Sequence, residues 1–167
     1  MVSYGIYNDG VYVCTLLDDQ TKEELIQYIT DYQIPNAVTK EQLHSTLIYS
    51  DSNVLDLKPI CDYPNPLIGQ SIGIEIWDGP SIESNTKKYL VLTFKCDGLL
   101  DRHQQILNEY NIQHKYSEFI SHVTLSYDVS DFDIALLPDI VTIIPSIKII
   151  GEVCTLPCPT YNKESTE

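Results

Sequence analysis

The segment His44-Ser45-Thr46-Leu47 returns 78 residues later in the chain as His122-Val123-Thr124-Leu125. A single His-x-Thr tripeptide arises readily by chance, but here the residues around the two copies match as well. Apolar or aromatic side chains recur within one residue of equivalent positions, in the pairs Tyr12 and Tyr89, Ile29 and Leu107, Tyr32 and Tyr110, Ile34 and Ile112, and Tyr49 and Tyr127. A repeat of this length is too long for a solenoid unit. The sequence therefore predicts an internal duplication in which each half contributes one His-x-Thr pair.

The local patterns follow the same order in both halves. A strand, a helix and the strand that carries the motif are predicted over residues 11–17, 22–33 and 43–49, and again over 89–96, 99–111 and 122–127. The first helix is marked by the capping box Thr21-Lys22-Glu23-Glu24. This order favours an α+β fold with two pseudo-symmetric lobes, in which two sheets face each other across a groove and helices pack outside.

The connecting segments carry weaker patterns. Ile72, Ile74 and Ile76 alternate with Gly73, Glu75 and Trp77, which predicts a half-buried strand with Trp77 on the face opposite the isoleucines. Asp78-Gly79-Pro80 is expected to end this strand and to lead into a polar loop over 81–86. The other expectations are an irregular connection over 51–66, a short helix or loop over 131–139, and one or two strands over 141–152.

The 167 residues fit a single domain. We expect one bilobal catalytic domain over residues 1–155, with lobes at about 1–80 and 81–155, and a polar tail over 156–167. An exchange of strands between the lobes is left open, as is the oligomeric state. The sequence has no apolar run of about 18 residues and no secretory signal, which predicts a cytoplasmic protein without a membrane span.

The charge of the chain argues against a long nucleic acid as its partner. Ten basic residues stand against 24 acidic ones, which gives a formal net charge of −14, and Arg102 is the one arginine. Proteins hold RNA and DNA largely by neutralising phosphates with Lys and Arg. A small ligand with two or three phosphates in a favourable pocket is compatible with this composition.

The two motifs have the geometry of an acid–base site. Residues two apart in a strand point to the same face, so His44 and Thr46 share one face, as do His122 and Thr124. Histidine has an ordinary pKa near 6.5, so one imidazole can accept a proton while the other donates one in phosphodiester cleavage. The threonine hydroxyls can hydrogen-bond the phosphate oxygens. We therefore predict that these four residues are catalytic, with no metal and no cofactor.

The strings HSTLIYS, IGIEIWDG and SHVTLSYD carry a resemblance to a known family. Paired His-x-Thr motifs resemble the 2H phosphoesterase superfamily, and the acidic chain is most similar to the phage anti-CBASS cyclic-oligonucleotide nucleases over roughly residues 1–155. The resemblance implies metal-independent cleavage of 3′–5′ bonds in cyclic di- and trinucleotides. These molecules signal infection in a bacterial anti-phage defence, so the enzyme would silence that signal in the host bacterial cytoplasm.

Four further residues are candidates for substrate binding: Tyr12, Trp77, Tyr116 and Glu152. Tyr12 and Trp77 are the candidates for stacking on a base, an interaction that tolerates different bases. A core position for Trp77 is the alternative. His103 and His114 have no repeat-equivalent partner, and we expect no catalytic role for them.

Two other functions remain open. A 2H phosphoesterase could act on RNA ends or on 2′,3′-cyclic phosphates, although the small number of basic residues argues against it. A protein of a different class could sequester cyclic nucleotides without cutting them. The sequence leaves the assignment of base and acid between the two histidines open as well.

Overall fold

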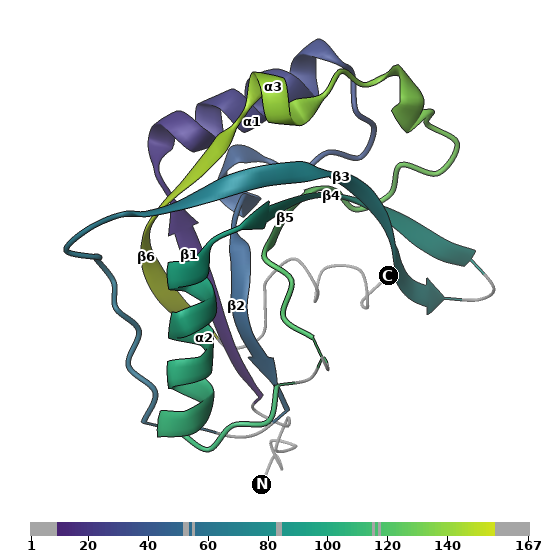
Figure 1. Ribbon diagram of the computed structural model, residues 1–167. Helices are drawn as coiled ribbons and strands as arrows, with labels where there is room; N and C mark the ends of the chain where they lie inside the picture. The colour runs from purple at the N-terminus through teal and green to yellow at the C-terminus, as the bar shows by residue number, and fades with distance from the viewer. Residues whose placement is uncertain are drawn as a thin grey trace, which may run out of the picture.

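One antiparallel sheet forms the centre of the molecule (Figure 1). The computed structural model describes residues 10–51, 54, 56–82, 85–114, 116 and 118–155, so the predicted tail over 156–167 lies outside it. Within these residues the strand order is β2-β1-β6-β3-β4-β5. The strands are β1 (Val11–Leu17), β2 (Ser45–Ser50), β3 (Leu67–Ile82), β4 (Asn85–Lys95), β5 (His122–Ser126) and β6 (Ser146–Thr155).

Equivalent strands of the two halves lie at matching distances from opposite edges of the sheet. β1 lies between β2 and β6, and β4 lies between β5 and β3. A helix follows each central strand, α1 (Asp19–Asp31) after β1 and α2 (Asp97–Glu109) after β4. The predicted order of strand, helix, motif strand and strand is therefore present in each half, and the α+β fold class is confirmed. The division into lobes at about residue 80 stays a prediction.

The expectation of two separate sheets is wrong. β3 and β6 pair over four residues on each strand, from Leu67 opposite Ile149 to Gln70 opposite Ser146, and this pairing joins all six strands. The sheet bends so strongly that β1 and β2 run nearly across the direction of β3 and β4 in Figure 1. A single curved sheet thus brings the two motif strands towards each other.

Several segments differ locally from expectation. Helix α1 begins earlier than the capping box predicts, because the Asp18 side chain accepts the Thr21 N–H at 2.8 Å and caps the helix. The pairing of β3 with β4 continues through Asp78 to Ile82, so Asp78-Gly79-Pro80 does not end the strand and a bulge absorbs the irregularity. Residues Ile140–Ile143 form the short helix α3 where a strand was expected.

Helices cover the outer side of the sheet. Leu25, Tyr28 and Ile29 of α1 are buried, and α2 buries Leu99 and Ile106. α1 and α3 lie together above β3 in Figure 1, and the remaining short helical turns are the 3₁₀ segments η1 (Lys40–Gln42) and η2 (Ile134–Leu136). Among the described residues, no helix has the length and apolar character needed to cross a membrane.

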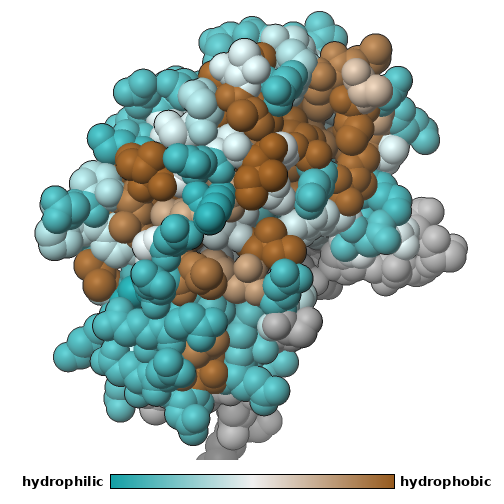
Figure 2. Space-filling model, viewed as in Figure 1, coloured by the Kyte–Doolittle hydropathy of each residue, from teal (hydrophilic) through white to brown (hydrophobic). Residues whose placement is uncertain are grey.

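The isoleucines of β3 are more exposed than their alternation predicts. Ile72 is 62% exposed and Ile76 is 39% exposed. Trp77, which lies on the face opposite Ile76, is half-buried. Apolar side chains gather on the surface around α3 and β3 in the space-filling view (Figure 2). The alternation correctly places Ile76 and Trp77 on opposite faces of β3, but a register shift between Ser71 and Gly73 interrupts it at Ile72.

Candidate functional site

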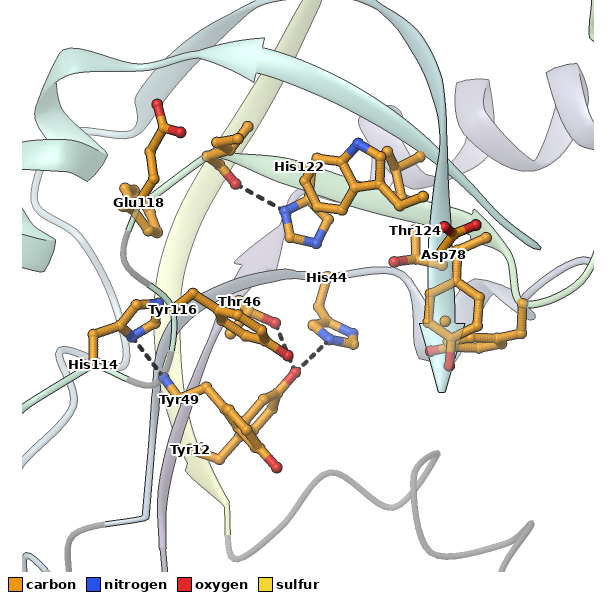
Figure 3. Close-up of a pocket in the computed structure, with 17 residues that line it drawn as sticks. Tyr12, His44, Thr46, Tyr49, Asp78, His114, Tyr116, Glu118, His122 and Thr124 are labelled. Carbon is orange, nitrogen blue, oxygen red and sulfur yellow. Dashed lines mark hydrogen bonds between the residues drawn. The ribbon is translucent and has the colours of Figure 1, made fainter. Parts of the chain in front are cut away.

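A cavity of about 620 Å³ opens between the two halves of the sheet. This volume is in the range of pockets that hold small organic ligands. Its lining includes all four residues of the two His-x-Thr pairs, namely His44, Thr46, His122 and Thr124. Figure 3 shows the imidazoles of His44 and His122 approaching each other across this space. The structure therefore brings the predicted catalytic residues together.

The two histidines are oriented in the same way. Nδ1 of His44 lies 2.6 Å from the carbonyl oxygen of Gln42, and Nδ1 of His122 lies 2.8 Å from the carbonyl oxygen of Ile120. A carbonyl oxygen can only accept, so in both rings Nδ1 carries the hydrogen. In the neutral form Nε2 is then the basic nitrogen. Each half of the duplication uses the carbonyl two residues before the histidine, and the arrangement is that of a general base or acid.

Tyr12 binds both members of the first pair. Its hydroxyl lies 2.9 Å from Nε2 of His44 and 2.8 Å from Oγ1 of Thr46. With neutral His44, the Tyr12 hydroxyl donates to Nε2 and accepts from Thr46. The ring is 7% exposed and packs edge-on against Tyr49. Tyr12, a predicted binding residue, thus lines the cavity and holds His44 and Thr46 in place.

Trp77 lies beside the second histidine. The ring centroids of Trp77 and His122 are 4.4 Å apart, and the indole N–H donates to Glu75 at 2.8 Å. Trp77 lines the cavity and is half-buried, so part of its surface can reach a ligand. Tyr116 also lines the cavity, where it is 62% exposed and stacks on Tyr49.

Burial shifts the acid–base behaviour of both imidazoles. Burial lowers the pKa of His44 below its ordinary value of 6.5, partly offset by the hydrogen bond to Gln42. Burial also lowers the pKa of His122. The hydrogen bond to the carbonyl oxygen of Ile120 opposes this shift, and the charge of a protonated His44 lowers the pKa of His122 further. Two protonated rings in this cavity repel each other, which disfavours the doubly protonated state.

Glu152 does not belong to the cavity, contrary to its prediction as a binding residue. It is fully buried on β6, where its carboxylate accepts from Arg102 at 2.7 and 3.0 Å. The Tyr63 hydroxyl and the Ile60 N–H also donate to it. Burial acts to raise the pKa of Glu152, but these hydrogen bonds and the charge of Arg102 outweigh it and lower the pKa. Glu152 thus anchors the segment before β3 and part of α2.

Three tyrosines of the lining, Tyr49, Tyr89 and Tyr127, were missed as site residues although the repeat contains them. Tyr49 and Tyr127 lie three residues after Thr46 and Thr124, a spacing that places them on the opposite face of a regular strand. The pairing shifts between Val13 and Cys14 in one half and between Leu90 and Val91 in the other. These matching bulges turn Tyr49 and Tyr127 into the cavity, because a bulge reverses the alternation.

His114 also lines the cavity, and it was missed as a site residue because it has no equivalent in the other half of the repeat. Its Nδ1 accepts the backbone N–H of Tyr49 at 3.3 Å, which covers part of the exposed edge of β2. His103 is buried behind it, with its Nδ1 2.7 Å from the carbonyl oxygen of Leu47. His114 therefore lines the cavity and His103 does not, while the expectation that neither histidine is catalytic stays a prediction.

The charged groups of the lining are acidic. Asp78 and Glu118 border the cavity, and the described lining contains no lysine or arginine. Arg102 is already paired with Glu152. In the part of the chain that the structure describes, no three His, Cys, Asp or Glu side chains come together as a metal site. Aromatic rings, hydroxyls and imidazoles therefore supply most of the groups that can contact a ligand.

The fold has counterparts among solved structures. TT0787 of Thermus thermophilus superposes with a TM-score of 0.54 at 13% identity, covering 87% of this chain and 86% of that one. The complex of E. coli LigT with 3′-AMP gives a TM-score of 0.53 at 14% identity and the same coverage. The fold is that of the 2H phosphoesterases.

Sequence comparison gives a narrower relationship. The anti-CBASS protein Acb1 of Escherichia phage RB16 is 28% identical to this chain over 151 residues, which cover 90% of this chain and 82% of the relative. The Acb1 of Salmonella phage S16 is 26% identical over 129 residues, which cover 77% of this chain and 79% of the relative. The model of the family "Anti-CBASS protein Acb1" matches residues 9–152, which include both His-x-Thr pairs and nearly the whole sheet. The chain therefore belongs to the anti-CBASS Acb1 family.

Proposed function

We propose that this protein is a phosphodiesterase that cleaves the 3′–5′ bonds of cyclic di- and trinucleotides and so antagonises CBASS defence in the host bacterial cytoplasm. Membership of the Acb1 family supports the anti-CBASS role. The observation that carries the chemistry is the convergence of His44 and His122, in equivalent orientations, in one cavity. The catalytic unit is the whole domain over residues 1–155, with each lobe supplying one histidine and one threonine.

The reaction begins with the ribose 2′-hydroxyl next to the scissile phosphate. One neutral imidazole takes the proton of this hydroxyl through Nε2, and the 2′-oxygen attacks phosphorus. The other imidazole, protonated, donates its Nε2 proton to the departing 5′-oxygen, so that a 2′,3′-cyclic phosphate and a 5′-hydroxyl are formed. Thr46 and Thr124 hydrogen-bond the non-bridging oxygens, where negative charge grows. Each acid or base contributes roughly 10²–10⁴-fold in rate.

A substrate-supplied nucleophile suits this site. The neighbouring 2′-hydroxyl is already held close to phosphorus, so little further entropy is lost when it attacks. A small substrate also suits the charge, because the described lining has no Lys or Arg that could neutralise a chain of phosphates. Trp77 and Tyr116 offer partly exposed rings on which bases can stack.

The decisive experiment incubates the full chain with a panel of cyclic di- and trinucleotides and reads the products by mass. We expect linear products that end in a 2′,3′-cyclic phosphate, formed equally in excess chelator. The matched control is the 2′-deoxy counterpart of each substrate, which should bind and remain intact. Recovery of intact ribonucleotide ligand after denaturation of its complex would instead establish a sequestering protein, and cleavage of the deoxy ligand would establish direct attack by water.

A further inference from the structure

A line of aromatic rings leads away from the catalytic pair along one wall of the cavity. Tyr12 contacts Tyr49 with ring centroids 5.7 Å apart, Tyr49 stacks on Tyr116 at 6.1 Å, and Tyr116 contacts His114 at 5.8 Å. All four residues line the cavity. Figure 3 shows them on the side of His44 remote from Asp78. A ligand with its phosphate at His44 would extend a base along these rings.

His114 ends this line with one defined hydrogen-bonding group. A backbone N–H can only donate, so the contact from Tyr49 requires that Nδ1 of His114 is unprotonated. Burial and the neighbouring His103 lower the pKa of His114 to about 4, so the ring is neutral near pH 7. The single ring hydrogen therefore lies on Nε2, and this nitrogen is a donor.

Within the described part of the chain this donor, Nε2 of His114, has no hydrogen-bond partner. The nitrogen is also not enclosed, because Ser45 Oγ is the one buried side-chain nitrogen or oxygen without a partner in the described part. An accessible donor beside an exposed tyrosine ring has the geometry of a contact to the edge of a stacked base.

We propose that His114 is a specificity residue whose Nε2–H donates to an acceptor on the edge of a nucleobase stacked on Tyr116. The proposal rests on the proposed function, since it requires a cyclic nucleotide in the cavity. The surroundings favour a base over a phosphate, because His114 lies among the rings of Tyr116, Phe119 and His103. The phosphate is the partner of the two catalytic imidazoles.

Two variants separate this role from the covering of the β2 edge. His114→Asn retains an acceptor near the position of Nδ1, which can hold the Tyr49 N–H, but it removes the donor. His114→Gln places an amide donor near the position of Nε2. Both are made in a His44→Ala/His122→Ala background, so that binding is measured without cleavage. The probes are cyclic di-AMP and its 1-deaza, 3-deaza and 7-deaza counterparts, each of which lacks one ring acceptor of adenine.

We expect His114→Asn to weaken cyclic di-AMP binding by about three- to tenfold, the effect of one neutral hydrogen bond, and His114→Gln to bind more tightly than His114→Asn. One deaza ligand should bind the protein that retains His114 about as weakly as cyclic di-AMP binds His114→Asn. His114→Asn should not weaken the binding of that deaza ligand any further. Unchanged binding in His114→Asn overturns the proposal, as does an equal loss for all four ligands, which would place the contact on ribose or phosphate. Equal losses in both variants with a lower melting temperature would assign the residue to the β2 edge. If the background protein binds none of the probes, the proposed function fails first.

Discussion

The Tyr12 hydroxyl hydrogen-bonds Nε2 of His44 at 2.9 Å and ties this catalytic candidate to a nearly buried ring. The same hydroxyl reaches Thr46, so three side chains of one half of the sheet form a connected unit. The other imidazole, His122, lies against Trp77 instead. The duplicated halves therefore orient their histidines alike but support them with different neighbours.

Removal of the Tyr12 hydroxyl tests this support. Tyr12→Phe keeps the ring and loses both hydrogen bonds, so we expect kcat to fall by about two- to tenfold with little change in melting temperature. Tyr12→Ala should in addition destabilise the fold by about 3–5 kcal/mol, as for other large buried rings. Steady-state kinetics and thermal unfolding check both variants. Wild-type kcat in Tyr12→Phe would mean that His44 is positioned by its Gln42 contact alone.

Removal of either histidine should stop most of the reaction. We expect His44→Ala and His122→Ala each to lower kcat by at least roughly 10²-fold, and the double variant to lose less than the product of the two. Gln104→Ala, at an exposed position of α2, is the matched control with unchanged kcat and melting temperature. A single variant with near-normal turnover would remove that histidine from the mechanism.

The pKa shifts set the pH dependence. Burial lowers the pKa of His44 and of His122 below 6.5, so protonation of the acid requires a lower pH than for an exposed histidine. The reaction needs one protonated and one neutral ring, and kcat/KM reports the free enzyme. We expect a bell-shaped profile of kcat/KM against pH with its maximum below 6.5 and a loss of activity as the pH rises. A maximum above pH 7.5 contradicts this.

Trp77 separates ligand binding from packing. If its ring stacks on a base, Trp77→Ala should weaken ligand binding by about 1–3 kcal/mol, and Trp77→Phe should retain part of the affinity. The effect should be similar for adenine and guanine ligands in titration calorimetry. Normal binding together with a lower melting temperature would show that the indole serves mainly to pack against His122.

The buried ion pair of Arg102 and Glu152 should matter for stability alone. Arg102→Met leaves a fully buried carboxylate without its cation, and we expect a loss of about 3–5 kcal/mol in the free energy of unfolding. The double variant Arg102→Met/Glu152→Gln should recover part of it, because no charge stays buried. Urea unfolding measures both, and kcat of the folded fraction should stay near the wild-type value. A large fall in kcat at unchanged stability would return Glu152 to the list of functional residues.

Local periodicity predicted the motif strands well. Alternation alone put His44 and Thr46 on one face, and the repeat indicated that His122 and Thr124 would meet them; both sets line one cavity. The register irregularities could not be predicted from the sequence, because the bulges that turn Tyr49 and Tyr127 inward depend on which strands pair with each other. The joining of the halves into one sheet depends on the β3–β6 pairing, which no local pattern contains.

Residues outside the motif strands were harder to place. His114 enters the cavity from an irregular segment after α2, where neither strand nor helix periodicity fixes the direction of a side chain. Glu152 was predicted in the pocket from its strand alone, but its direction on β6 follows from the pairing with Thr15 and from Arg102 on α2. Such contacts join distant parts of the chain, and only the folded sheet determines them.

The position of β6 beside β1 has a consequence for how the protein folds. Val13 of β1 pairs with Cys154 of β6, so β1 gains one of its two neighbours in the sheet from a strand that is synthesised after all the other described strands. Contacts of such long sequence separation slow folding, since the entropy of closing a long loop is lost before the contacts stabilise the chain. Until then β1 presents an unpaired edge that can recruit other chains. A chain truncated before Ser146 would keep both His-x-Thr motifs yet retain that open edge, and we expect it to aggregate during synthesis rather than accumulate as a smaller enzyme.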